Sequence, residues 1–144
     1  MSIASSDYST AKASNVAARR LYSDLDLGLP IHPVKKDIVP LTDIRAVKNA
    51  VKNLVLTNFN ERPFHPEIGS NVTALLFEPA DVFTANAIKE EILYVLKKYE
   101  PRTNGHTVEV TDNSERNAYE ITIGFNVIFS PKREEINFYL QRLR

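Results

Sequence analysis

The sequence predicts an α+β fold, with helices packed on one face of a small antiparallel sheet. Apolar residues recur at helical spacing between residues 43 and 99. After residue 106 they alternate with polar residues, which is typical of strands. Short turns separate the alternating segments and favour antiparallel pairing. With 144 residues, 43% of them hydrophobic, the chain is long enough for one domain with its own core.

The first 40 residues divide into two parts. Residues 1–20 are rich in Ser and Ala and poor in large apolar side chains, so we expect a mobile N-terminal arm before a single domain at 21–144. Three prolines and a glycine between Leu21 and Pro40 exclude a long helix or a central strand. This stretch is too apolar for a free linker, so we expect an extended segment that lies over the domain surface or over a neighbouring molecule.

Two amphipathic helices and one short helix are predicted. Thr42 is the expected N-cap of a helix from Asp43 to Thr57, whose apolar residues recur at three- and four-residue steps. The main helix runs from Asp81 to Lys98 and ends by Tyr99. A short helix is expected over residues 71–77. The Asn60–Gly69 loop contains two prolines and is expected to be ordered, with Phe64 and Ile68 as its anchors.

Three strands follow Gly105. Alternation predicts strands at residues 107–111 and 119–129, joined into a β-hairpin by a polar turn. The C-terminal strand contains Ile136, Asn137, Phe138, Tyr139 and Leu140. A three-stranded sheet has two edges with unpaired main-chain groups. The C-terminal strand is therefore either an ordinary edge protected by basic side chains or a docking edge to which another chain adds a strand.

The tripeptide Glu100-Pro101-Arg102 lies between the helical and strand halves. Pro101 prevents the helix from continuing and disfavours helical geometry at Glu100. In an extended segment, residues two apart point to the same side, so Glu100 and Arg102 are expected to form a charged pair. Most such pairs mark a helix end and contribute only ~0–1 kcal/mol when solvated. The alternative is a preset binding element.

Composition excludes several classes of protein. The chain has eighteen basic and eighteen acidic residues, and zero net charge argues against binding to nucleic acid mainly through phosphates. The absence of cysteine excludes disulfides and thiolate metal sites. No apolar run approaches the ~18 residues that a membrane-spanning helix needs, and no export signal is evident. We therefore expect a soluble protein with no membrane contact.

Tests for an enzyme also fail. His32, His65 and His106 lie in separate segments without metal-ligand spacing, and neither a phosphate-binding glycine loop nor another cofactor motif is present. Glycoside hydrolysis needs two carboxyl groups about 5–9.5 Å apart. Glu78 and Glu100 lie at opposite ends of the main helix, which separates them by more than about 25 Å. We expect no small-molecule substrate, no cofactor and no catalytic residue.

Four segments carry a family resemblance. In their order and spacing, the chain resembles the baseplate wedge proteins that start the tail sheath in contractile-tailed bacteriophages, with relatives in type VI secretion and other contractile injection systems. Glu-Pro-Arg after a long helix is the most specific of the four marks. The segments are Tyr22–Asp26, Arg62–Gly69, Leu75–Glu78 and Tyr99–Arg102.

The resemblance implies a structural role in the virion, for a protein made in the host cytoplasm. The expected partners are other baseplate wedge proteins, the tail sheath protein and the sixfold baseplate assembly. Glu100, Pro101 and Arg102 are implicated in the contact with the wedge core, and the likeness favours the docking-edge interpretation of the strand at 136–140. Some members carry a tail-lysozyme label, so a peptidoglycan-cleaving enzyme with Glu100 or Glu78 as general acid is the alternative. The nearby Arg102 opposes it, because a cation favours a charged carboxylate.

Overall fold

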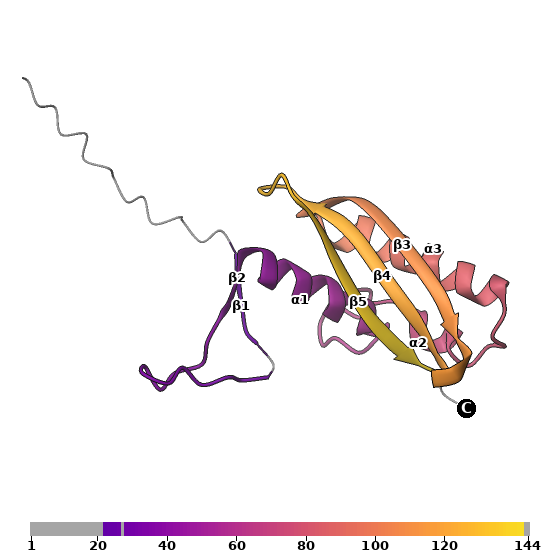
Figure 1. Ribbon diagram of the computed structural model, residues 1–144, viewed down its shortest axis with the longest axis horizontal. Coiled ribbons are helices and arrows are strands. Elements are labelled where there is room, and N and C mark those ends of the chain that lie inside the picture. Colours follow the sequence, from indigo (N-terminus) through magenta and orange to yellow (C-terminus); the bar gives the residue numbers. More distant parts are fainter. Residues whose placement is uncertain (1–21, 27, 143–144) are drawn as a thin grey trace, which may run out of the picture.

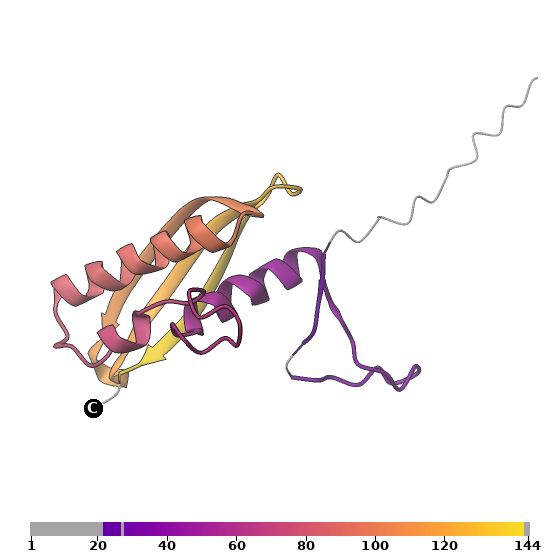
Figure 2. The ribbon, with the colours of Figure 1, turned by 180° about the vertical axis from the view of Figure 1, so that it is seen from behind.

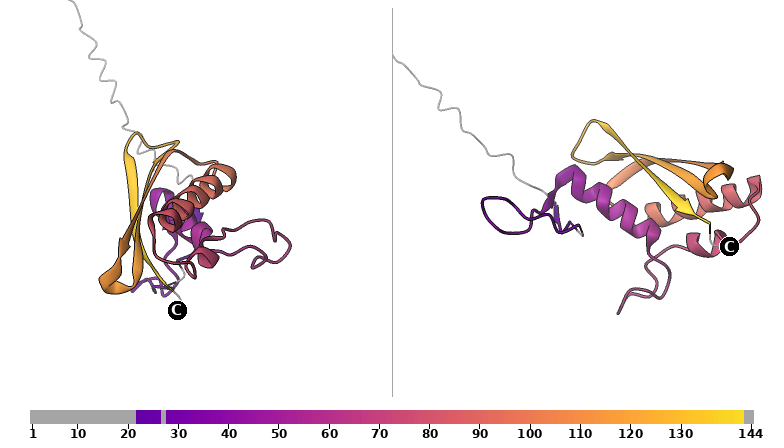
Figure 3. Two further views of the ribbon diagram at one scale, coloured as in Figure 1. Left: turned by 90° about the vertical axis from the view of Figure 1, so that its right-hand side faces the viewer. Right: turned by 60° about the horizontal axis from the view of Figure 1, so that its bottom comes forward.

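The computed structural model describes residues 22–26 and 28–142 and confirms the α+β class (Figure 1). A three-stranded antiparallel sheet has the order β3-β4-β5, and the helices cover one of its faces (Figure 3). The predicted arm at residues 1–20 lies outside the described residues. The elements are β1 (Ser23–Asp24), β2 (Leu41–Thr42), α1 (Asp43–Leu56), α2 (Val72–Leu75), α3 (Val82–Tyr99), β3 (Thr103–Asn113), a 3-10 turn (Ser114–Arg116), β4 (Ala118–Val127) and β5 (Arg133–Gln141).

Local sequence signals explain where the two long helices begin and end. At the start of α3, the Thr84 amide donates a 2.7 Å hydrogen bond to Oδ1 of Asp81, which is a side-chain N-cap. Lys97 and Lys98 follow in its last turn, where the helix dipole favours positive charge. Thr42 occupies the N-cap position of α1 as predicted, but its side chain makes no capping hydrogen bond.

The core lies between the helices and the inner face of the sheet. The α1 and α3 stripes are buried at the spacing that the sequence predicts. Alternate residues of β4 meet them from the sheet. The largest fully buried side chains are Tyr119, Phe125, Ile88, Ile92, Leu96, Ile121, Ile123, Val47, Val51, Val55, Val72 and Val95.

The first strand of the sheet begins earlier than predicted. We expected strand structure only after Gly105, but β3 starts at Thr103, directly after the Glu-Pro-Arg tripeptide. The register with β4 shifts between Asn104 and Thr107, and Gly105 adopts a positive φ of 61° within this irregularity. Gly105 therefore serves a bulge inside the strand and does not mark its boundary.

The segment between β1 and β2 corrects one expectation. Tyr22 packs against the core, and β1 pairs with β2. Beyond this pair the chain stands out from the body near the start of α1 (Figures 1 and 2), where Leu29, Ile31 and Val34 are exposed. The segment therefore does not lie over the domain surface, while contact with a neighbouring molecule stays a prediction. Within residues 22–26 and 28–142, no helix is long and apolar enough to span a membrane.

The Asn60–Gly69 loop corrects a second expectation. Ile68 is half-buried and serves as an anchor, but Phe64 does not, because its side chain is 97% exposed. The loop stands out from the helical side of the molecule, away from the sheet (Figure 3). The prolines that predicted an ordered turn gave no information about which way the aromatic ring points.

Candidate partner-binding site

Glu100 is the C-cap residue of α3, and its side chain is only 4% exposed. Its amide donates to the Leu96 carbonyl oxygen at 3.0 Å, which closes the helix. Its carbonyl oxygen accepts from both the amide (3.2 Å) and the hydroxyl (3.1 Å) of Thr103. The Thr103 hydroxyl also lies 2.8 Å from Nε2 of His106. The turn that carries the carboxylate is thus fixed at both ends.

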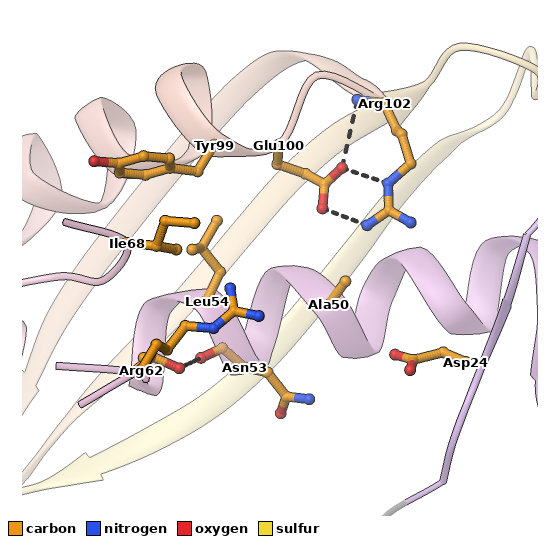
Figure 4. Close-up of a pocket in the computed structure, with 10 residues that line it drawn as sticks. Asp24, Ala50, Asn53, Leu54, Arg62, Ile68, Tyr99, Glu100 and Arg102 are labelled. Atoms are coloured by element: carbon orange, nitrogen blue, oxygen red, sulfur yellow. Dashed lines mark hydrogen bonds and ion pairs between the residues drawn. The ribbon is translucent and has the colours of Figure 1, made fainter. Parts of the chain in front are cut away.

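Arg102 forms the predicted charged pair with Glu100, but the extended segment expected between them is wrong. Pro101 and Arg102 lie in a turn, which the Thr103 amide closes onto the Glu100 carbonyl oxygen. The Nε and Nη2 atoms of Arg102 lie 2.6 Å from the two carboxylate oxygens of Glu100 (Figure 4). This two-pronged geometry is the strongest form of an Arg–carboxylate bond. Glu100 raises the pKa of the Arg102 guanidinium, so the group stays charged. The Arg102 side chain is 31% exposed, so a partner can reach the guanidinium while the Glu100 carboxylate stays buried.

Tyr22 completes the support of Arg102. The guanidinium carbon lies 5.2 Å from the centre of the Tyr22 ring, within the range of a cation–π contact. The same ring packs against Phe129 at a centroid distance of 5.2 Å. Sequence reasoning included Tyr22 in a family motif but did not connect it with Arg102. The two residues are 80 positions apart, and no periodicity of the chain links them.

A pocket of about 430 Å³ opens beside the pair. Arg102 and Glu100 form one wall, and Arg62 and Ile68 from the loop before α2 form another (Figure 4). Among the described residues, Arg62 makes no ion pair, and its side chain is exposed. The pocket is lined by two guanidinium groups, from Arg62 and Arg102, and by two carboxylates, from Asp24 and Glu100. Arg102 is paired with Glu100, so Arg62 is the guanidinium that suits a carboxylate or main-chain carbonyl group from outside.

The β5 strand, the second predicted site, forms an edge of the sheet. Within the described residues it pairs only with β4. Phe138 and Leu140 point into the core and are buried, and Ile136 is half-buried on the same side. Asn137 and Tyr139 alternate with them and are exposed. One face of the strand thus packs on the core, and the side chains of its other face are at the surface.

The direction of the main-chain groups of β5 follows from its register. Just beyond the strand, the Arg142 amide donates to the Asn117 carbonyl oxygen at 3.0 Å, which marks a hydrogen-bonded pair. Such pairs alternate along an antiparallel ladder. The main-chain N–H and C=O groups of Glu135, Asn137 and Tyr139 therefore point away from β4, toward the free edge.

A groove of about 360 Å³ separates this edge from α1. The side chains of Arg45, Lys48 and Lys52 line it from the helix, and residues 136–138 line it from the strand. Lys48 spans the gap to Glu134 with an ion pair of 2.7 Å. The α1 side of this groove is therefore basic, and Asp26 contributes one carboxylate to the lining.

The carboxylates considered for catalysis are not arranged for it. Glu78 lies exposed in the turn after α2, and the whole of α3 separates it from Glu100. Both oxygens of Glu100 accept hydrogen bonds from Arg102, and the side chain is buried, so neither oxygen is positioned to contact a substrate. In the part of the chain that the structure describes, no group of three or more His, Asp or Glu residues is placed to hold a metal ion.

Comparisons with known proteins agree on one family. A family model described as baseplate wedge protein gp25 matches residues 42–132, a range that contains the Glu-Pro-Arg tripeptide and ends just before β5. Baseplate wedge protein gp25 of Enterobacteria phage T4 is 30% identical over 112 residues, which cover 78% of this chain and 84% of the phage protein.

Two solved structures share the fold. A Geobacter sulfurreducens protein provisionally named a tail lysozyme matches with a TM-score of 0.63 and 18% identity, over 68% of this chain and 89% of that one. A chain of the sixfold-symmetrised baseplate of the anti-feeding prophage matches with a TM-score of 0.57 and 13% identity, over 85% of this chain and 87% of that one. Identities this low establish the fold alone.

Proposed function

The chain belongs to the baseplate wedge protein gp25 family, and from that membership we propose that it binds the core of a contractile-tail baseplate wedge and templates the first sheath ring. Membership confirms the resemblance inferred from the four sequence segments. The protein is then a structural, non-enzymatic component of the virion, and its partners are other wedge proteins and the tail sheath protein.

The Glu-Pro-Arg tripeptide is the proposed contact with the wedge core. The observation that carries this proposal is the two-pronged bond between Glu100 and Arg102 at the mouth of a pocket. A solvated helix-end pair needs neither a buried carboxylate nor an aromatic ring under the guanidinium. Here Glu100 is buried and Tyr22 supports Arg102, so the guanidinium is held in one orientation before any partner arrives. A preset orientation lowers the entropic cost of binding.

The test is co-purification of tagged protein with its candidate wedge partners. Arg102→Ala alone is unsuitable, because it leaves the buried Glu100 without its counter-ion. The double substitution Glu100→Gln and Arg102→Met removes both charges and keeps similar side-chain volumes. We expect the double variant to remain folded, by circular dichroism and thermal melting, and to lose its partners. Full retention of the partners contradicts the proposed wedge contact.

The β5 edge is the proposed template for the sheath. A strand from a sheath subunit can pair with the outward main-chain groups of Asn137 and Tyr139, as in β-augmentation. The basic groove beside α1 suits an incoming strand that carries acidic side chains.

Two substitutions at Asn137 test whether a sheath strand binds the main chain of β5 or the Asn137 side chain. Asn137→Pro removes the N–H that points to the free edge, and edge strands tolerate proline where the N–H faces solvent. Asn137→Ala keeps the N–H and removes only the side chain. We expect sheath growth on baseplates, seen by electron microscopy, to stop with Asn137→Pro and to continue with Asn137→Ala. Normal sheath growth with a folded Asn137→Pro variant contradicts the template role. Deleting residues 136–144 is a poorer test, because Phe138 and Leu140 belong to the core.

A further inference from the structure

Phe64 combines exposure with an unfavourable backbone conformation. It lies in the loop between α1 and α2, and its side chain is 97% exposed. Its φ of 67° lies in the left-handed region, which a bulky residue seldom adopts. The free protein therefore exposes an aromatic ring on a strained residue. Strain of this kind persists where the surrounding structure imposes it, and it concentrates at functional positions.

The loop around Phe64 is held by the rest of the protein. Gly69 allows the two ends of the loop to meet, because a Cβ atom there would lie 2.7 Å from the main-chain carbonyl of Asn58. Hydrogen bonds also cross the loop and tie it to α3. They run from the Asn60 amide to the Pro66 carbonyl (2.9 Å), from the Ile68 amide to the His65 carbonyl (3.2 Å), and from the Tyr99 hydroxyl to the Glu67 carbonyl (2.6 Å).

The same loop forms a wall of the pocket at the Glu-Pro-Arg tripeptide. Arg62 and Ile68 line this pocket opposite Glu100 and Arg102, and Figure 4 shows the Arg62 guanidinium directed into it. Arg62 is two residues before Phe64 and makes no ion pair within the described part of the chain. A partner that reaches Arg102 through this pocket therefore also meets the loop.

We propose that the loop at residues 58–70 is a second binding element for the same wedge partner, with Phe64 as its aromatic anchor. This inference rests on the proposed wedge contact. The partner segment presents an apolar cavity for the Phe64 ring and, beside it, a carboxylate for Arg62. Aromatic residues and arginine are enriched in protein interfaces, and both residue types are present in this loop. The backbone strain at Phe64 is then maintained because it fixes the ring in the orientation that the partner accepts.

The chain offers a matched control. Phe83 is also exposed, at 83%, but it lies in the first turn of α3, a regular helix. Phe64 instead belongs to the loop whose Arg62 and Ile68 line the Glu-Pro-Arg pocket, although neither phenylalanine lines the pocket itself. Single exposed apolar residues are common on protein surfaces and need no partner. If exposure alone mattered, substitutions at Phe83 and Phe64 would have equal effects on binding.

The experiment measures the Kd of the purified full-length protein for its wedge partner and the melting temperature of each variant. We expect Phe64→Ala to weaken binding by about thirtyfold or more, the size of effect that marks a dominant interface residue. Phe83→Ala is expected to stay within about twofold of wild type. Phe64→Gly relieves the strain at positive φ, so it is expected to melt no lower than Phe64→Ala while binding equally poorly.

The outcomes separate this inference from the proposed wedge contact. Loss of binding with both Phe64→Ala and the Glu100→Gln, Arg102→Met double variant supports both. Loss with the double variant alone overturns the role of Phe64 and leaves the wedge contact standing. Loss with Phe64→Ala alone overturns the Glu-Pro-Arg contact, and with it the shared interface proposed here. Equal binding by all variants overturns both.

Discussion

Removing only Arg102 from the Glu100–Arg102 pair should cost more stability than removing both charges together. Removing one partner of a buried ion pair costs about 3–5 kcal/mol. Arg102 keeps 31% of its side-chain surface exposed, so water can partly hydrate the carboxylate left behind, and we expect about 2–3 kcal/mol for Arg102→Met. For a protein of this size, that is a fall in melting temperature of roughly 8–12 °C. Methionine preserves the apolar stem beside Tyr22, so the change isolates the charge.

The assay is a double-mutant cycle followed by chemical denaturation. Glu100→Gln alone should cost about 1–2 kcal/mol, because one amide oxygen still accepts from the guanidinium while the amide nitrogen opposes it. The double variant should lose only about 1–2 kcal/mol, so the two single losses exceed the double loss by about 2 kcal/mol. Additive losses, within about 0.5 kcal/mol, would refute the idea that the pair acts as one unit.

Three further predictions concern the rest of the fold. Tyr119→Phe should raise the free energy of unfolding by about 1 kcal/mol in chemical denaturation, since the buried hydroxyl has no hydrogen-bond partner among the described residues; a loss of stability contradicts this. Burial lowers the pKa of His106 below its ordinary value of 6.5, so the unfolded chain takes up the proton first as the pH falls. Stability should therefore decline as the pH falls below about 6.5, until His106 is also protonated in the folded state. His106→Gln should reduce this fall of the melting temperature with pH, and an unchanged pH dependence of the melting temperature contradicts the prediction. Replacing residues 29–38 by two glycines should leave the melting temperature within about 2 °C, because the segment stands away from the core, and a larger fall would show that it supports the fold.

The fold could be predicted because each element carries a local signal. The three-and-four spacing in α1 and α3 and the alternation in β4 and β5 are properties of neighbouring residues, and the structure places these elements where the pattern indicates. The pairing of Glu100 with Arg102 was also predictable locally, because the two residues flank Pro101 at a helix end, although the Thr103 amide closes a turn there instead of an extended segment. The predicted start of β3 after Gly105 was wrong, because a glycine can mark either a strand end or a bulge. Only the pairing with β4 distinguishes the two.

The rest of the site depends on long-range contacts that no local pattern carries. Tyr22 reaches Arg102 from the other end of the chain, and Arg62 shares a pocket with it only because the loop before α2 folds back toward the end of α3. Phe64 was expected to be an anchor on the core because aromatic residues usually bury their rings. The structure instead exposes the ring and gives Phe64 a left-handed backbone conformation, and the sequence of an ordinary turn reveals neither.

The most direct test is a cryo-electron microscopy map of the assembled baseplate that contains this protein, at a resolution that shows side chains. We expect the pocket beside Glu100 and Arg102 to be filled by a wedge partner, with an acidic side chain or main-chain carbonyl group facing Arg102. We also expect a sheath strand to be hydrogen-bonded to Asn137 and Tyr139 along the free edge of β5. A map in which the pocket and the β5 edge both face solvent would contradict the proposed role in the wedge.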